Sequence, residues 1–87
     1  QLAPKRAAVA DTYGWLLSQG GKPAEGVTIL ESAHNAATGD GDIGYHYASA
    51  LAASGKRSQA KLLLERVLDI GTEFTSRKSA EQLLATL

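Results

Sequence analysis

The chain has 87 residues, of which 44% are hydrophobic and 21% are charged, and nine basic residues balance nine acidic ones. A chain of this length supports a single core, and its composition is that of a folded globular or repeat domain rather than of a disordered segment. Because the net charge is zero, there is no basic surface for nucleic acid or for an anionic membrane, and we expect neither partner.

Several features that are absent from the sequence narrow the kind of protein further. No apolar run approaches the roughly 20 residues of a membrane-spanning helix, so we expect no direct membrane insertion. Without cysteine the chain has no disulfide and no thiolate metal ligand, so its composition does not indicate whether it works in an oxidising or a reducing compartment. It also lacks methionine, so we expect a C-terminal piece of a longer protein. We predict no metal ion and no cofactor.

The first predicted unit is a pair of helices. A helix near residues 5–19 carries four apolar residues at helical spacing: Val9, Tyr13, Leu16 and Leu17. The glycines at 20–21 end it, and Pro23 suits the first turn of a return helix over 23–36. The return helix has four residues on one face: Val27, Leu30, Ala33 and His34. The loop at 38–41 ends the unit.

The second predicted unit repeats this scheme. Asp42 is the predicted N-cap of a helix whose apolar stripe consists of Ile43, Tyr47, Ala50 and Leu51. A turn at 54–55 leads to a helix with a second stripe: Ala60, Leu63, Leu64, Val67 and Leu68. We expect Gly71 to close this helix and Thr75 or Ser76 to cap a last one, whose apolar residues are Ala80, Leu83, Leu84 and Leu87.

The two units are related by a shift of 34 residues. Identical residues then coincide: Tyr13 with Tyr47, Leu17 with Leu51, Gly21 with Gly55, Lys22 with Lys56, Leu30 with Leu64, Glu31 with Glu65 and Thr38 with Thr72. Small residues also coincide: Ala10 with Gly44, Gly14 with Ala48, Gly26 with Ala60 and, less strictly, Ala33 with Val67. Small side chains allow two helices to cross closely. We therefore predict helix-turn-helix repeats at 7–40 and 41–74, an N-terminal extension at 1–6 and a capping helix at 75–87.

Over nearly the whole chain these units resemble the tetratricopeptide repeat (TPR) family. The pattern small-x-x-Tyr-Gly/Ala-x-x-Leu, then Gly, then Gly/Ala-x-x-x-Leu-x-x-Ala/Val occurs twice in register. The departures are Gly26 in place of alanine, and Thr38 and Thr72 in place of proline, and we expect them to loosen the units. The resemblance implies an all-α, right-handed α-α superhelix of five helices that serves as a protein-interaction scaffold and not as an enzyme.

A narrower resemblance concerns the segments 11–15 and 45–48 and the leucine-rich end after Phe74. They are similar to the C-terminal region of bacterial TPR-repeat lipoproteins associated with PEP-CTERM protein sorting and exopolysaccharide production. This implies a full-length protein with further TPR repeats upstream, placed in the periplasm or at the outer membrane and active in exopolysaccharide or surface-protein export. A cytoplasmic location is the alternative, and the location of the fragment itself stays open.

The TPR resemblance also implies a binding groove, because the first helix of each pair lines the concave surface in that family. Carried onto this register, the groove consists of Asp11, Thr12, Trp15, Ser18, Gln19, Asp42, Tyr45, His46 and Ser49. Trp15 and Tyr45 would be aromatic anchors for a protein or peptide ligand. In the alternative interpretation these rings pack against a neighbouring repeat, or the whole fragment is a structural C-terminal cap and upstream repeats bind.

The remaining polar residues do not suggest catalysis. His34 lies on an apolar stripe, where we expect a hydrogen-bonded structural histidine. Asp40 and Asp42 lack the other oxygen ligands of a calcium loop, so a loop with a helix cap is the expected role. Acidic and neutral groups in the groove do not suit a clamp for a peptide carboxylate. The exposed end of the first helix offers a surface for a homodimer.

Overall fold

The computed structural model describes residues 4–70 and 73–87, and all regular structure in these ranges is helical. The helices are α1 (Pro4–Gln19), α2 (Pro23–Ala36), α3 (Gly41–Ala53), α4 (Arg57–Asp69) and α5 (Arg77–Ala85). The predicted all-α class and five helices are confirmed for the described residues. Residues 4–6, assigned to an extension, begin α1. The predicted helix end at Gly71 and the repeat position Thr72 lie outside the described residues.

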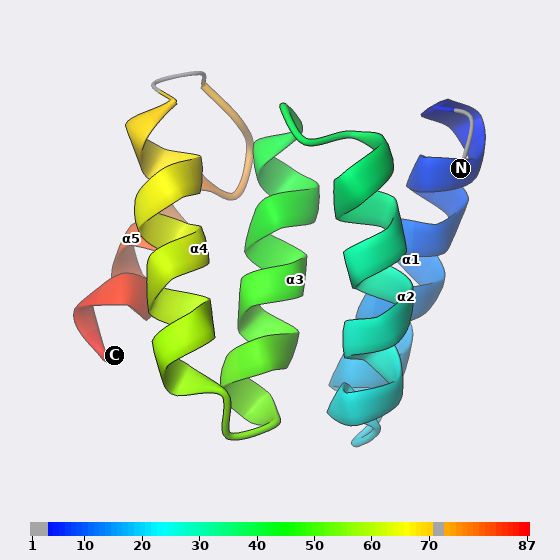
Figure 1. Cartoon of the computed structure of the whole chain (residues 1–87), viewed down its shortest axis with the longest axis horizontal. Helices are drawn as coiled ribbons and strands as arrows, with labels where there is room; N and C mark the ends of the chain where they lie inside the picture. The colour runs from blue at the N-terminus through cyan, green and yellow to red at the C-terminus, as the bar shows by residue number, and fades with distance from the viewer. Residues whose placement is uncertain (1–3, 71–72) are drawn as a thin grey trace.

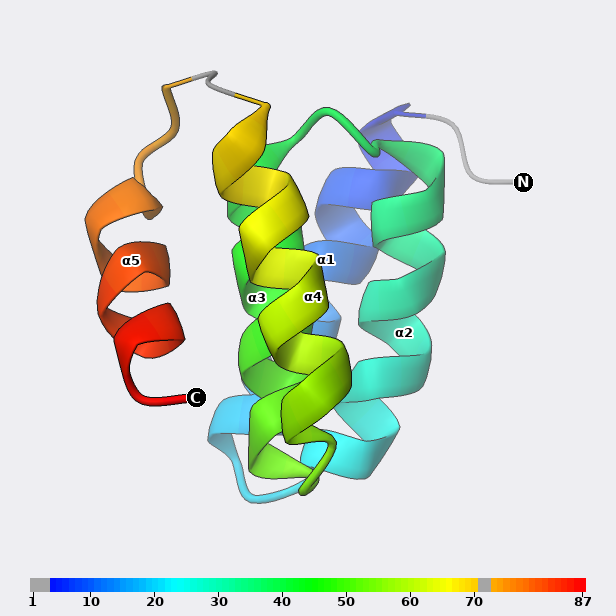
Figure 2. The same ribbon diagram turned by 60° about the vertical axis from the view of Figure 1, so that its left-hand side comes forward.

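α3 is the central helix of the molecule. It packs against α1 and α2 on one side and against α4 and α5 on the other (Figure 1). The two hairpins, α1 with α2 and α3 with α4, stand beside each other, and α5 lies against α3 and α4 away from the first hairpin (Figure 2). Consecutive helices are therefore neighbours in space throughout.

The two hairpin turns close in the same way. Gly21 and Gly55 both adopt left-handed backbone, with φ of 87° and 83°, a region that favours glycine. The residue after each glycine donates its N–H to a carbonyl five residues earlier, Lys22 to Leu17 and Lys56 to Leu51, both at 2.9 Å. This is the hydrogen bond of a glycine-terminated helix end. The predicted equivalence at 34 residues thus extends to the backbone.

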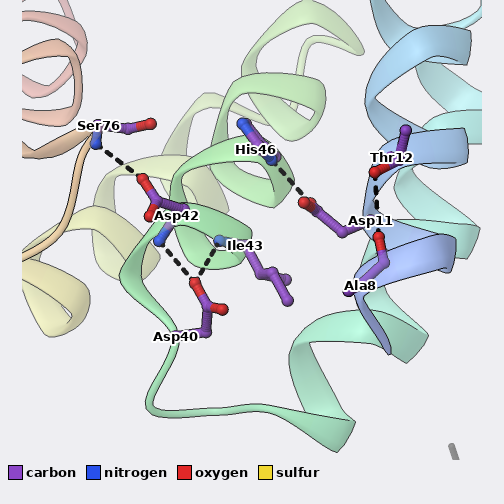
Figure 3. Close-up of polar contacts among 8 residues, drawn as sticks. All are labelled: Ala8, Asp11, Thr12, Asp40, Asp42, Ile43, His46 and Ser76. Atoms are coloured by element: carbon purple, nitrogen blue, oxygen red, sulfur yellow. Dashed lines mark hydrogen bonds and ion pairs between the residues drawn. The ribbon is translucent and has the colours of Figure 1, made fainter. Parts of the chain in front are cut away.

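The N-terminal ends of α3 and α5 are held by aspartates. Asp40 caps α3, because its Oδ1 accepts the N–H groups of Asp42 at 3.0 Å and Ile43 at 3.1 Å. The prediction of Asp42 as the cap is wrong, since Asp42 already lies in the first turn. Its Oδ1 instead accepts the N–H of Ser76 at 2.7 Å (Figure 3). Ser76 precedes α5 as predicted, but its hydroxyl makes no capping hydrogen bond.

The core contains one fully buried leucine in each hairpin. Leu30 and Leu64, equivalent in the repeat, are both 0% exposed. The second hairpin and α5 share a cluster of buried residues: Ala48, Leu51, Ala60, Leu63, Leu64, Val67 and Ala80. The ring of Phe74 also packs against it and occupies the space that a Cβ on Gly41 would need. The C-terminal helix is therefore part of the same core as α3 and α4.

Glycine allows α1 and α2 to approach closely. A Cβ on Gly26 would lie 2.7 Å from the carbonyl oxygen of Gly14, and a Cβ on Gly14 would lie 2.8 Å from Cγ of Leu30. The predicted small residues therefore do sit at the helix crossing. The expectation that Gly26 loosens the unit stays a prediction, but this hairpin has no space for the alanine that the family pattern has there.

The apolar stripe predicted for α1 does not face the core. Val9, Tyr13 and Leu16 are 70%, 57% and 63% exposed, and only Leu17 is half-buried. The buried positions of α1 are instead its small residues, Ala7 among them at 1% exposed. The apolar character of these residues does not show that they are buried, because it does not reveal which side of a helix has a neighbour.

Candidate functional site

A hydrogen bond between a histidine and an aspartate joins the first helices of the two hairpins. His46 Nδ1 on α3 lies 2.7 Å from Asp11 Oδ1 on α1 (Figure 3). The side chains are 17% and 15% exposed, so water reaches neither freely. When His46 is protonated this is a charge-assisted hydrogen bond, and in the neutral form Nδ1–H can donate to the carboxylate. In both forms the pair holds α1 and α3 at a defined separation.

Two aromatic rings lie against the His46 ring of this pair. Trp15 follows Asp11 by one helical turn and stacks on His46, with ring centroids 4.2 Å apart and planes 23° apart. Tyr45 lies 5.9 Å from Trp15 and 5.8 Å from His46, tilted against both. These four residues, Asp11, Trp15, Tyr45 and His46, are called the α1–α3 cluster below. Each is half-buried, so the cluster both packs the two helices together and retains exposed surface.

Three further predicted groove residues lie on the same two helices without joining the cluster. Thr12 is exposed, and its hydroxyl donates to the carbonyl of Ala8 at 3.1 Å. Gln19 is exposed at the end of α1. Ser49 is half-buried one turn beyond Tyr45 on α3. They can supply neutral hydrogen-bonding groups at the edge of the cluster.

The other two predicted groove residues have different neighbours. Ser18 lies at the crossing of α1 and α2, where a Cβ on Gly26 would be 3.2 Å from the Cβ of Ser18. Asp42 is occupied with the N–H of Ser76 before α5. Of the nine predicted residues, the structure therefore gathers four into one cluster.

The pairing of Asp11 with His46 was not predicted, although the sequence holds a signal for it. The two residues are 35 positions apart, one more than the repeat. Residues separated by about one repeat lie on the first helices of successive hairpins, and these helices pack directly against each other. Two residues of opposite charge, or a hydrogen-bond donor and acceptor, at this separation are therefore candidates for contacts between hairpins.

A hollow between α2 and α4 was also not predicted. It has a volume of about 310 Å³ and α3 forms its base. The residues that line it are His34, Asn35, Tyr47, Leu51, Gln59, Leu62, Leu63 and Arg66. The ring of His34 lies 5.6 Å from that of Tyr47. The prediction of a hydrogen-bonded His34 is wrong, because its buried Nδ1 has no hydrogen-bond partner among residues 4–70 and 73–87.

Burial favours the neutral forms of the two titratable rings of this hollow. It lowers the pKa of His34, and the positive charge of Arg66 lowers that pKa further. Burial raises the pKa of the Tyr47 phenol, and the carboxylate of Glu31, by its charge and as a hydrogen-bond partner, raises it further. Neutral His34 avoids placing a buried charge next to Arg66.

The lowered pKa of His34 predicts a loss of stability in acid. The unfolded chain takes up a proton near the ordinary histidine pKa of about 6.5, whereas the folded chain resists protonation until lower pH. The free energy of unfolding should therefore fall as the pH drops through 6.5, by less than about 1 kcal/mol, because solvent screens a half-buried group. Urea titrations at pH 7.5 and 5.5 measure this fall, and His34→Gln should make it smaller. An equal fall in the variant would contradict this role of His34.

Comparison of the chain with protein-family models, with curated proteins and with solved structures finds no match. Across the described ranges, no three side chains of His, Asp or Glu come together in a way that could hold a metal ion. None of the helices described combines the length and the apolar character that crossing a bilayer requires.

Proposed function

We propose that this chain is a fragment of a TPR-like α-α superhelix that acts as a protein-interaction scaffold without catalytic activity. The supports are two helix hairpins with the same turn geometry, equivalent buried leucines at 34-residue spacing, and direct packing of each hairpin on the next. A stack of this kind places the first helices of successive hairpins next to each other. In this chain those helices are α1 and α3.

The α1–α3 cluster is the observation that carries the proposed binding role. Trp and Tyr are enriched among the energetic hot spots of protein interfaces. Here Trp15 and Tyr45 lie side by side on two different helices, 5.9 Å apart. A ligand that covers both rings would bury apolar area on each hairpin at once.

The Asp11–His46 hydrogen bond supports this surface, because it links the helices that carry the two rings. Asp11 and His46 satisfy each other at 2.7 Å, and His46 supports the face of Trp15 by stacking. A preorganised surface loses less conformational entropy on binding. Because Asp11 is already paired, the cluster offers little to a ligand of high charge. The ligand we propose is a peptide segment or helix with an apolar side chain against Trp15 and Tyr45 and neutral polar groups near Thr12 and Ser49.

The setting of the full-length protein is a further proposal that rests on the resemblance of the segments 11–15 and 45–48. We propose a bacterial envelope lipoprotein with additional TPR repeats upstream, in exopolysaccharide or surface-protein export. A cytoplasmic TPR protein is the alternative. Detection of the full-length protein in fractionated periplasm and outer membrane, against cytoplasm, tests this setting.

A second candidate function is that of a structural C-terminal cap, with binding done by upstream repeats. The half-burial of Trp15 against His46 and Tyr45 favours it, because a ring used for helix packing need not contact a ligand. α5 also covers α3 and α4, as a terminal helix of a stack would. The two functions differ in what removal of the indole should change.

Trp15→Ala tests the scaffold against the cap. Peptides selected on the unchanged chain from a random display library should bind the variant at least about 10-fold more weakly, because the truncation removes a hot-spot ring. Fluorescence anisotropy of labelled peptides gives Kd, and circular dichroism gives Tm. Gln59→Ala, on α4 and outside the cluster, is the control and should leave Kd unchanged. A large fall in Tm with unchanged Kd, or a failure to select any peptide, would support the cap.

A further inference from the structure

The second helices of the two hairpins enclose a hollow that lies apart from the α1–α3 cluster. α2 and α4 run in the same direction on either side of α3 (Figure 1), and the hollow of about 310 Å³ between them is called the α2–α4 hollow below. Tyr47 at its base follows Tyr45 of the cluster by two residues, a turn of about 200° around α3, so the two sites lie on different sides of this helix. Sites for small molecules have volumes of about 300–1,000 Å³, and this one suits a small ligand.

The polar side chains of the α2–α4 hollow are not engaged with other groups. Arg66 makes no ion pair and no hydrogen bond with another described residue, and the amides of Asn35 and Gln59 likewise make no hydrogen bond within the described ranges. The carboxylate of Glu31 is a hydrogen-bond partner of Tyr47, and Glu31 is not among the residues that line the hollow. A guanidinium group with five N–H donors is therefore available to a ligand.

His34 supplies a further hydrogen-bond donor. Its Nδ1 is enclosed by protein and has no partner in residues 4–70 and 73–87. Buried N–H groups without an acceptor are rarer in proteins than buried acceptors without a donor, so we assign the proton of the neutral ring to Nε2. Nε2 is not enclosed, and it too has no partner in these ranges. The ring edge that can meet a molecule in the hollow therefore carries an N–H.

The remaining wall of the α2–α4 hollow is apolar. Leu51 and Leu63 are buried, and Leu62 on α4 is 62% exposed. Gln59 and Arg66 are seven residues apart on α4, so the hollow extends about 10 Å along this helix. A molecule of that length can place one polar end at Arg66 and lay an apolar body along the leucines.

We propose that the α2–α4 hollow binds a small organic carboxylate with an apolar body. The carboxylate accepts hydrogen bonds from Arg66 and from the Nε2–H of His34, and the apolar body covers Leu62 and Leu63. A guanidinium group matches a carboxylate in charge and in geometry, whereas a cationic ligand would meet a like charge. This site does not depend on peptide binding at the α1–α3 cluster or on any repeat outside the chain.

An NMR titration of the isotope-labelled chain with 4-phenylbutanoate tests this proposal. We expect a Kd of about 1 mM, as is usual for so small a ligand of moderate efficiency. Amide signals of α2 and α4 around the hollow and the ring signals of His34 should shift, whereas the ring signals of His46 should not. The uncharged 4-phenylbutanamide should bind at least about 3-fold more weakly, because it lacks the ionic contact with Arg66. Butanoate, which lacks the phenyl ring, should also bind more weakly.

Two variants separate the ionic contact from the apolar one. Arg66→Gln should weaken 4-phenylbutanoate at least about 3-fold and leave the amide unchanged. Lys61→Gln is its control, because it removes the same charge from an exposed position of α4 that does not line the hollow, and it should change neither Kd. Leu62→Ala should weaken both ligands, and since this side chain is largely exposed the fold should persist.

Equal affinity for 4-phenylbutanoate and its amide would overturn the proposal, because the hollow would then be only an apolar surface. Signal shifts confined to the exposed side of α1, or the absence of any shift at about 20 mM ligand, would overturn it as well. An equal loss of affinity in Arg66→Gln and Lys61→Gln would show attraction by overall charge rather than a site.

Discussion

Leu64→Ala should lower the free energy of unfolding by about 2–5 kcal/mol, the range for truncating a fully buried leucine. Leu64 is 0% exposed in a cluster shared by α3, α4 and α5, so three helices lose contacts with one side chain. Small domains have a total stability of only about 5–15 kcal/mol. Chemical denaturation followed by far-ultraviolet circular dichroism should show a much lower midpoint, or a chain largely unfolded in buffer.

Leu62→Ala is the matched control for this result. It makes the same chemical change on the same helix, two residues away, at a side chain that is 62% exposed. We expect a change within about 0.5 kcal/mol, as for other surface substitutions. If both variants lost the same stability, α4 would not face the core as described here.

Gly26→Ala should destabilise the first hairpin by about 1–3 kcal/mol, the usual cost of overpacking a close contact. In an isolated helix this change would be favourable by up to about 1 kcal/mol, since alanine is the better helix former. Here the new Cβ would lie 2.7 Å from the backbone oxygen of Gly14, which cannot move without shifting α1. The steric effect should therefore exceed the gain in helix propensity, and thermal unfolding measures the sign.

Gly39→Ala provides the comparison for Gly26→Ala. Gly39 lies in the loop before α3, and a Cβ built on it meets nothing within 4 Å. The substitution should be neutral or slightly stabilising, because it reduces the freedom of the unfolded chain without a clash. A stabilising effect of Gly26→Ala as well would show that the two helices of the first hairpin can separate at little cost.

The helices and turns could be predicted from the sequence because their determinants are local. The glycines at 20–21, Pro23 and the glycine at 55 mark the hairpins where the structure has them, and the stripes of α3 and α4 correctly identify Leu51, Leu63 and Leu64 as core residues. Caps were harder. Asp40 and Asp42 are equally suited to an N-cap by residue type, and only the position of the first turn distinguishes them.

The candidate site could be predicted only in part. Repeat register placed Asp11, Trp15, Tyr45 and His46 on the first helices of the two hairpins, and the structure brings them within contact of one another. It also put Ser18 and Asp42 in the same set, although one lies at the crossing with α2 and the other holds the start of α5. A position on a helix predicts its face to within about one residue, and a change of one residue turns a side chain by about 100°.

The sequence by itself determined the helical class, the 34-residue period and the small residues at the helix crossing, because these depend on backbone preference and side-chain volume at regular spacing. Only the tertiary structure decided which apolar row is covered. Val9, Tyr13 and Leu16 have the same spacing as Ile43, Tyr47 and Ala50 on α3 and an apolar character that would equally suit a core, yet they are exposed. Burial depends on a neighbour, and no property of α1 alone reveals whether that neighbour is present.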